Sequence, residues 1–182
     1  MKHAPFHKES IFKRNTADDL AVFLGRLAMV MMGLALAESF LAGIVSRSLL
    51  KTVSFDYRQL VSFQLFLSHG HIFILGVVIP IILAFFVRSL RADLTDGEVR
   101  SLKRGVGIYI AGSLLTLGLM LYKGYAYVLL FSAEPIFPLE TIDSQLFGGN
   151  QLFRSLAYGL AHPLLALGLI WCLVVIYRAG KR

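Results

Sequence analysis

The chain has 182 residues, of which 57% are hydrophobic and only 16% are charged. A soluble domain carries about a quarter charged residues, so this composition excludes an ordinary soluble protein and is typical of a polytopic membrane protein. The formal net charge is +7, and no nucleic-acid-binding motif accompanies it. We therefore expect the basic residues to set the membrane topology and contact lipid, with no nucleic acid as a partner.

The first predicted span covers about residues 20–45 and follows a basic tail of residues 1–19. At ~1.5 Å per residue, this length crosses a hydrocarbon core of roughly 30 Å. Thr16 and the acids up to Asp19 form an N-cap pattern, so we expect a helix start there. Glu38 lies deep in this span, where its side chain cannot easily reach water.

The second predicted span, about residues 62–87, contains two histidines one residue apart. His69 and His71 stand in an apolar run, where ionisable groups are rare and usually face a bundle interior or a wet cavity. A helix turns about 100° per residue, so their side chains point about 200° apart. We expect one imidazole to be a ligand and the other to meet a neighbouring helix or a second cofactor. Pro80 predicts a kink farther along.

The third span is predicted at about residues 105–131, with Lys123 near its exit. The fourth is predicted at about residues 152–177 and contains His162. Pro163 follows this histidine and cannot donate a backbone hydrogen bond, so the helix is loosened there.

Basic residues gather in the N-terminal tail, in the loop of residues 88–104 and in the tail of residues 179–182, whereas the loop of residues 132–151 has no Lys or Arg. The positive-inside rule then predicts cytoplasmic termini. We therefore predict an all-α fold, an integral membrane four-helix bundle with both termini cytoplasmic. Residues 20–178 form its membrane domain, placed in the bacterial inner membrane and in contact with the lipid bilayer.

In this topology, polar side chains from all four spans share one layer in the outer half of the membrane. The layer comprises Glu38, His69, His71, Lys123 and His162, and Arg154 lies near it on a similar face to His162. Burying so many polar groups for stability alone is inefficient. We therefore interpret the layer as one functional site.

Haem b is the first ligand that this layer could bind, because helical bundles commonly house such cofactors in their cores. One histidine of the second span and His162 would be the axial ligands. Lys123 and Arg154 would neutralise the propionates. Four glycines would make room for the macrocycle: Gly70, Gly76, Gly159 and Gly168.

Two other chemistries use the same residues. A non-haem iron, copper or zinc ion could take His69, His71, His162 and Glu38 as ligands, although the two neighbouring histidines cannot both chelate one ion without a local distortion. Alternatively, a Glu–His–Lys relay through Lys123 could transfer protons or ions without a cofactor.

Our leading functional prediction is a small redox protein that binds haem b or another transition metal and exchanges electrons with quinol or a respiratory complex. The alternatives are a proton-linked transporter and an accessory subunit of a larger membrane complex, and a homo-oligomer is compatible with each. The sequence contains no nucleotide-binding loop and no nucleophile elbow, so kinase or hydrolase chemistry of the soluble type is not expected, and no catalytic residue is assigned.

One short piece in each span carries a resemblance to a known family. The pieces are Glu38, the H-x-H sequence from His69 to His71, Lys123-Gly124, and Gly159-Leu160-Ala161-His162. Together they resemble a family of small bacterial four-helix integral membrane proteins of unknown function. That family usually has Thr between the two histidines, where this chain has Gly70, and no proline at the position of Pro163. The resemblance implies a four-helix membrane fold and supports the site, but it implies no reaction.

Overall fold

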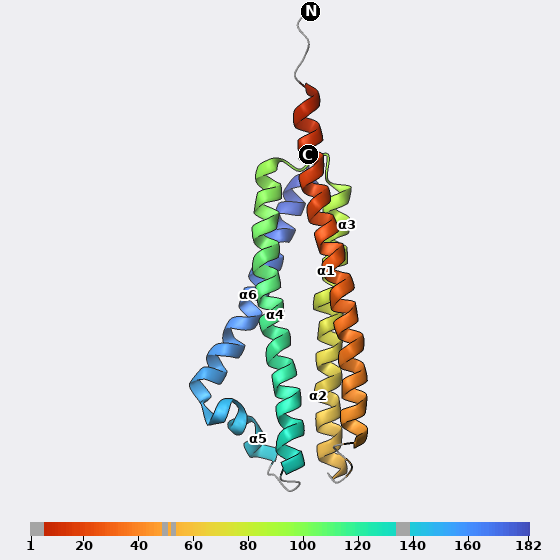
Figure 1. Ribbon diagram of the computed structural model, residues 1–182. Helices are drawn as coiled ribbons and strands as arrows, with labels where there is room; N and C mark the ends of the chain where they lie inside the picture. The colour runs from red at the N-terminus through yellow and green to blue at the C-terminus, as the bar shows by residue number, and fades with distance from the viewer. Residues whose placement is uncertain (1–5, 49–50, 52–53, 134–138) are drawn as a thin grey trace, which may run out of the picture.

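The computed structural model describes residues 6–48, 51, 54–133 and 139–182. These residues form helices and short connections without a strand (Figure 1). The helical elements are α1 (Phe6–Ser48), α2 (Phe55–Phe73), the π-helix η1 (Ile74–Val78), α3 (Ile79–Ser89), α4 (Asp96–Ala133), α5 (Leu139–Gln145), the 3-10 helix η2 (Leu146–Gly149) and α6 (Gln151–Ala179). The prediction of an all-α fold is confirmed.

Among the described residues, four helices are long and apolar enough to cross a membrane, as predicted. Their bounds are Thr16–Arg47, Phe55–Ser89, Asp96–Ala133 and Gln151–Ala179. The predicted helix start at Thr16 is wrong, because α1 already begins at Phe6. Good helix formers such as Lys8 and Glu9 precede the N-cap pattern, and they extend the helix through it.

The outside of the bundle is covered by large apolar side chains that have no partner helix. Among the most exposed are Met29, Phe40, Phe66, Leu129 and Leu152. A soluble protein rarely exposes apolar patches of this extent, whereas a bilayer solvates them. The chain is therefore a multi-pass membrane protein whose outer surface contacts lipid.

The four spans pack as two pairs. α1 packs along α2, η1 and α3, while α4 packs along α6, and the pairs meet mainly where α2 contacts α4. α6 stays beside α4 in its C-terminal half and diverges from it towards α5 (Figure 1). α1 begins and α6 ends at the same end of the bundle, which we call the terminal end. The opposite end, with α5 and η2, is called the loop end. That the terminal end faces the cytoplasm stays a prediction.

Glycines let the backbones of α4 and α6 touch. A Cβ added to Gly112 would overlap the backbone of Leu165, and one added to Gly168 would overlap the backbone of Tyr109. Such close approach is the usual basis of helix association in lipid, where no hydrophobic force drives helices together. This contact fixes α6 against α4 on the terminal side of the point where α6 diverges.

The second span changes its helical register at η1, just before the proline where we predicted a kink. The N–H of Ile79 donates to the carbonyl of Ile74, five residues back, and Pro80 has no N–H to continue this pattern. The carbonyl of Leu75 would therefore lack a backbone donor. The hydroxyl of Tyr109 on α4 donates to it instead, so the neighbouring helix completes the hydrogen bonding of this turn.

Two apolar clusters lie on either side of Glu38 along the length of the bundle. The middle cluster contains Ala28, Met31, Ala35, Ile72, Val77 and Leu117. The cluster at the loop end contains Val61, Leu65, Tyr127, Val128, Phe131, Ile142 and Leu146. Glu38 lies on the α1 turn that follows Ala35, so its carboxyl group is placed between the two clusters.

Candidate functional site

A carboxyl group and an imidazole meet between α1 and α2. Glu38 is 6% exposed, and its Oε2 lies 3.8 Å from Nδ1 of His69. The same nitrogen lies 3.0 Å from the carbonyl oxygen of Ala35 and 2.7 Å from Oγ of Ser39. Because a carbonyl oxygen only accepts hydrogen bonds, Nδ1 carries a hydrogen. The lone pair of the neutral ring is then on Nε2, which lies 3.4 Å from Oγ of Ser39.

The carboxyl group of Glu38 has few polar neighbours. Within the described residues, neither of its oxygens has a hydrogen-bond partner, and neither does the buried hydroxyl of Tyr125. Tyr125 belongs to α4 and is close enough to Glu38 to interact with it electrostatically. An isolated buried charge is very costly. Glu38 can avoid one by holding a proton or by facing a protonated His69.

His71 is separated from this pair, in keeping with the helical spacing. Its Nδ1 donates to the carbonyl of Leu67 in its own helix, at 2.8 Å. This bond orients the ring and leaves Nε2 for another partner. Metal-binding histidines are commonly oriented in this way.

His162 lies on an exposed part of α6, and it makes no hydrogen bond with any residue that the structure describes. Its neighbour Ala161 is fully buried.

A second polar site surrounds Asp143 of α5 at the loop end. Nζ of Lys123 lies 3.1 Å from its Oδ1, the hydroxyl of Tyr127 donates to the same oxygen, and the guanidinium of Arg154 donates to its backbone carbonyl. Burial acts to raise the pKa of Asp143, but the hydrogen bonds from Tyr127 and Lys123 and the charges of Lys123 and Arg154 outweigh it and lower that pKa. The carboxylate is therefore the charged centre of this site.

Aromatic rings fix the segment beside Asp143. The N–H of Phe147 donates to the hydroxyl of Tyr122 at 2.8 Å, and the two ring centroids are 4.7 Å apart. Phe147 has φ of 56°, a left-handed conformation that is uncommon for a bulky residue. The rings of Phe153 and Tyr158 also contact it. These contacts hold η2 between α4 and α6.

Comparison with known families identifies one match. The family described as "Protein of unknown function (DUF2871)" matches residues 24–179. The chain belongs to this family. The match includes every residue of both polar sites, and it agrees with the predicted resemblance to a family of unknown function. No match was found among curated proteins or among solved structures.

In this DUF2871 protein, the predicted polar layer is divided into separate sites. Glu38 and His69 lie together, whereas Lys123 and Arg154 both contact Asp143. The prediction from sequence places Lys123 and Arg154 at haem propionates and does not include Asp143. The charge pattern could have revealed Asp143, because this residue belongs to an acidic loop that lies next to two basic residues at the same depth.

The predicted metal ligands are not gathered at one point. In the part of the chain that the structure describes, no three His, Cys, Asp or Glu side chains form a group that could hold a metal ion. Of the predicted set, only Glu38 and His69 are in contact. His71 bonds to its own helix instead, and His162 lies in the N-terminal half of α6.

The glycines predicted to make room for a haem divide into two groups. A Cβ on Gly76 would lie 2.7 Å from the side chain of Met31, and Gly168 is a backbone contact with α4, so both are helix-packing positions. Gly70 and Gly159 have open space beside them. These two leave room next to His71 and His162.

Proposed function

We propose that this protein transfers protons within the bacterial inner membrane, as a proton-linked carrier, with Glu38 and His69 as its proton-binding pair. The observation that carries the proposal is a buried carboxyl group that has no hydrogen-bond partner among the described residues, 3.8 Å from an imidazole on the neighbouring span. Ionisable residues at membrane depth usually serve ion pathways or proton relays.

With one proton bound, the pair has two states of zero net charge, carboxylic acid with neutral imidazole and carboxylate with imidazolium; without that proton, the carboxylate faces a neutral imidazole. A proton that arrives at Nε2 of His69 in the deprotonated pair makes the imidazolium, which faces the carboxylate. The proton on Nδ1 then passes to Glu38 as the two groups approach, and His69 returns to neutral. The carbonyl of Ala35 and the hydroxyl of Ser39 orient Nδ1 during this exchange.

Proton flux into vesicles tests the proposal. Purified protein is reconstituted into liposomes with an internal pH-sensitive dye, and a pH gradient is imposed. We expect Glu38→Gln and His69→Gln to reduce flux at least tenfold, which corresponds to about 1.4 kcal/mol in the barrier. Asp56→Asn, which changes an exposed carboxylate at the start of α2, is the matched control and should keep full flux.

The same variants separate a proton-binding role from a structural one. Glu38→Gln should change the free energy of unfolding by less than about 1 kcal/mol, because a neutral amide needs no counter-charge, whereas breaking a structural buried ion pair costs about 3–5 kcal/mol. A Glu38→Gln protein with wild-type flux would refute the proposal.

A redox protein that binds haem b or another transition metal is the second candidate. The observation that favours it is Nε2 of His71, whose Nδ1 is held by a backbone carbonyl, together with His162; neither Nε2 of His71 nor the His162 ring has a partner in the part of the chain that the structure describes. These two residues would be the ligands. A bound haem or metal would supply one-electron chemistry, with quinol as the partner.

Absorption spectra and elemental analysis of protein in mild detergent test this candidate. A Soret band or stoichiometric iron, copper or zinc that is lost in both His71→Ala and His162→Ala would support it. A colourless, metal-free wild-type protein that conducts protons would leave the proton-linked carrier as the function. Stable copurification of a larger complex would indicate an accessory subunit.

A further inference from the structure

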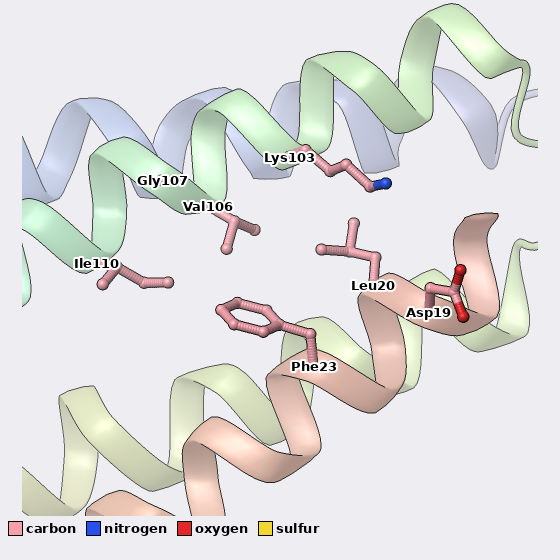
Figure 2. A pocket seen from close by; sticks show the side chains of 7 residues that line it. All are labelled: Asp19, Leu20, Phe23, Lys103, Val106, Gly107 and Ile110. Atoms are coloured by element: carbon pink, nitrogen blue, oxygen red, sulfur yellow. The ribbon is translucent and has the colours of Figure 1, made fainter.

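Grooves between the spanning helices open at the terminal end, and their floors are apolar. One groove of about 370 Å³ lies between α1 and α4 (Figure 2). Leu20, Phe23 and Val106 point into it, and Asp19 and Lys103 stand at its mouth. These two residues carry opposite charges, so the mouth of this groove has no net charge.

The groove between α1 and α3 is larger, at about 530 Å³, and its mouth is different. Its apolar lining includes Ala21, Val22, Gly25, Ile81, Ala84 and Phe85. Asp18, Arg88 and Arg91 stand at the mouth. Arg91 lies 3.5 Å from Asp18, and these two charges compensate each other. Arg88 is exposed and forms no ion pair within the described residues, so the mouth carries one uncompensated positive charge.

Arg26 adds a second cation on the same side of α1. It follows Val22 by one turn, inside the candidate span that begins at Thr16, and it is exposed without an ion pair among the described residues. A guanidinium stays charged, so in lipid its side chain must extend to the phosphate layer. Helical side chains lean towards the helix N-terminus. Arg26 therefore extends along Val22 towards the mouth of the α1–α3 groove.

We propose that the α1–α3 groove binds one anionic phospholipid. Arg88 and Arg26 contact the phosphate, because guanidinium groups match phosphate oxygens in charge and geometry. An acyl chain lies along Phe85 and Ile81, about one and two turns deeper than Arg88. The charge at the mouth selects an anionic headgroup, and the apolar lining requires a lipid rather than a free phosphate. This inference does not depend on the proposed proton transfer.

Competition between two lipids tests the inference. The full chain is reconstituted in nanodiscs with equal amounts of phosphatidylglycerol and phosphatidylcholine, transferred to mild detergent and measured by native mass spectrometry. We expect the wild type to retain phosphatidylglycerol preferentially. Arg88→Gln and Arg26→Gln should each lower that preference about fivefold, equivalent to about 1 kcal/mol per basic residue near an anionic surface. Lys103→Gln, in the electrically neutral groove of Figure 2, is the matched control and should keep the preference.

Several outcomes would overturn the inference. Equal retention of the two lipids by the wild type would show that the groove does not select an anion. An equal loss in Lys103→Gln and Arg88→Gln would indicate general surface charge instead of a site. Disulfide crosslinking of Val22→Cys between two chains would show that a second copy occupies the groove. Circular dichroism melting identifies any variant that is misfolded. If Arg88→Gln is misfolded, Arg88→Lys replaces it; this variant keeps the charge and must retain the preference for phosphatidylglycerol.

Discussion

Asp143 shows how a single residue can connect three elements. It lies on α5, and its partners come from α4 and α6. Its charge is stabilised by these partners despite partial burial, since its pKa lies below the ordinary value of 3.8. The residue therefore contributes more to stability as a carboxylate than as a carboxylic acid.

This difference predicts an acid-dependent loss of stability. Because the folded-state pKa of Asp143 is lowered, its contribution is complete above the ordinary pKa and is lost as the pH falls through the lowered value. We expect the wild type to melt at a higher temperature than Asp143→Asn at neutral pH. The difference should disappear as the pH falls below about 4. Circular dichroism melting in detergent between about pH 7 and pH 2 measures it, and a difference that persists at the acid end would contradict the assignment.

For the candidate site, the sequence predicts the depth of each residue along its span, but not the direction in which its side chain points. Counting along the spans places Glu38, His69, His71 and His162 at similar depth, because every residue of a helix adds the same rise. The direction in which each side chain points across the bundle depends on how the helices are rotated and tilted. An apolar sequence with few polar residues does not specify that rotation and tilt. Hence the sequence places Glu38 and His69 in one set of candidate ligands without singling out their contact.

The α4–α6 interface is the element most sensitive to substitution. Gly112 faces the backbone of Leu165, which cannot move aside as a flexible side chain can. Gly112→Val should lower the free energy of unfolding by about 1–3 kcal/mol or more, because overpacking forces the helices apart. Gly118 lies on the same helix with open space beside it, so Gly118→Val is the control and should be nearly neutral. Unfolding in mixed detergent micelles, followed by circular dichroism, distinguishes the two.

The hydrogen bond that crosses from α4 to η1 predicts a coupled pair of substitutions. Tyr109→Phe leaves the carbonyl of Leu75 without a donor and should cost about 1–3 kcal/mol. Pro80→Ala restores an N–H that can donate to that carbonyl. In the Pro80→Ala background, Tyr109→Phe should therefore cost less. A double-mutant cycle measures the difference, and strictly additive effects would show that Tyr109 does not replace the missing donor.

The element pattern shows which features of a membrane helix can be predicted from sequence. The four spans follow from long apolar runs, and their number is confirmed. Their polar ends, such as residues 6–19 and 55–61, continue as helix beyond the hydrocarbon core, where hydropathy gives no signal. The π-helix could not be predicted. A span that faces lipid is apolar on all sides, so it lacks the periodicity that reveals helical register.

The topology of the whole molecule can be tested with single cysteines. Cys172 is the only cysteine and is fully buried, so it gives little background labelling. We expect Ser144→Cys, at the loop end, to react with a membrane-impermeant maleimide in intact cells. Lys181→Cys, at the terminal end, should react only after the cells are opened, because the basic terminal end is predicted to face the cytoplasm. Labelling with the opposite pattern would invert the orientation of the bundle.

The π-helical turn gives the second span two halves with different rotational phase. Its buried positions include Ile72, Gly76 and Pro80, which are separated by four residues each time, whereas a straight α-helix alternates intervals of three and four. Removing one residue from η1 and closing the turn as an α-helix would restore the shorter repeat, because five π-helical residues turn about as far as four α-helical ones. Leu83 and Val87 would then keep facing the core, and the two histidines before η1 would stay where they are. The π-helical turn thus sets the rotational phase between the half of the span that carries the histidines and the half that packs in the apolar core.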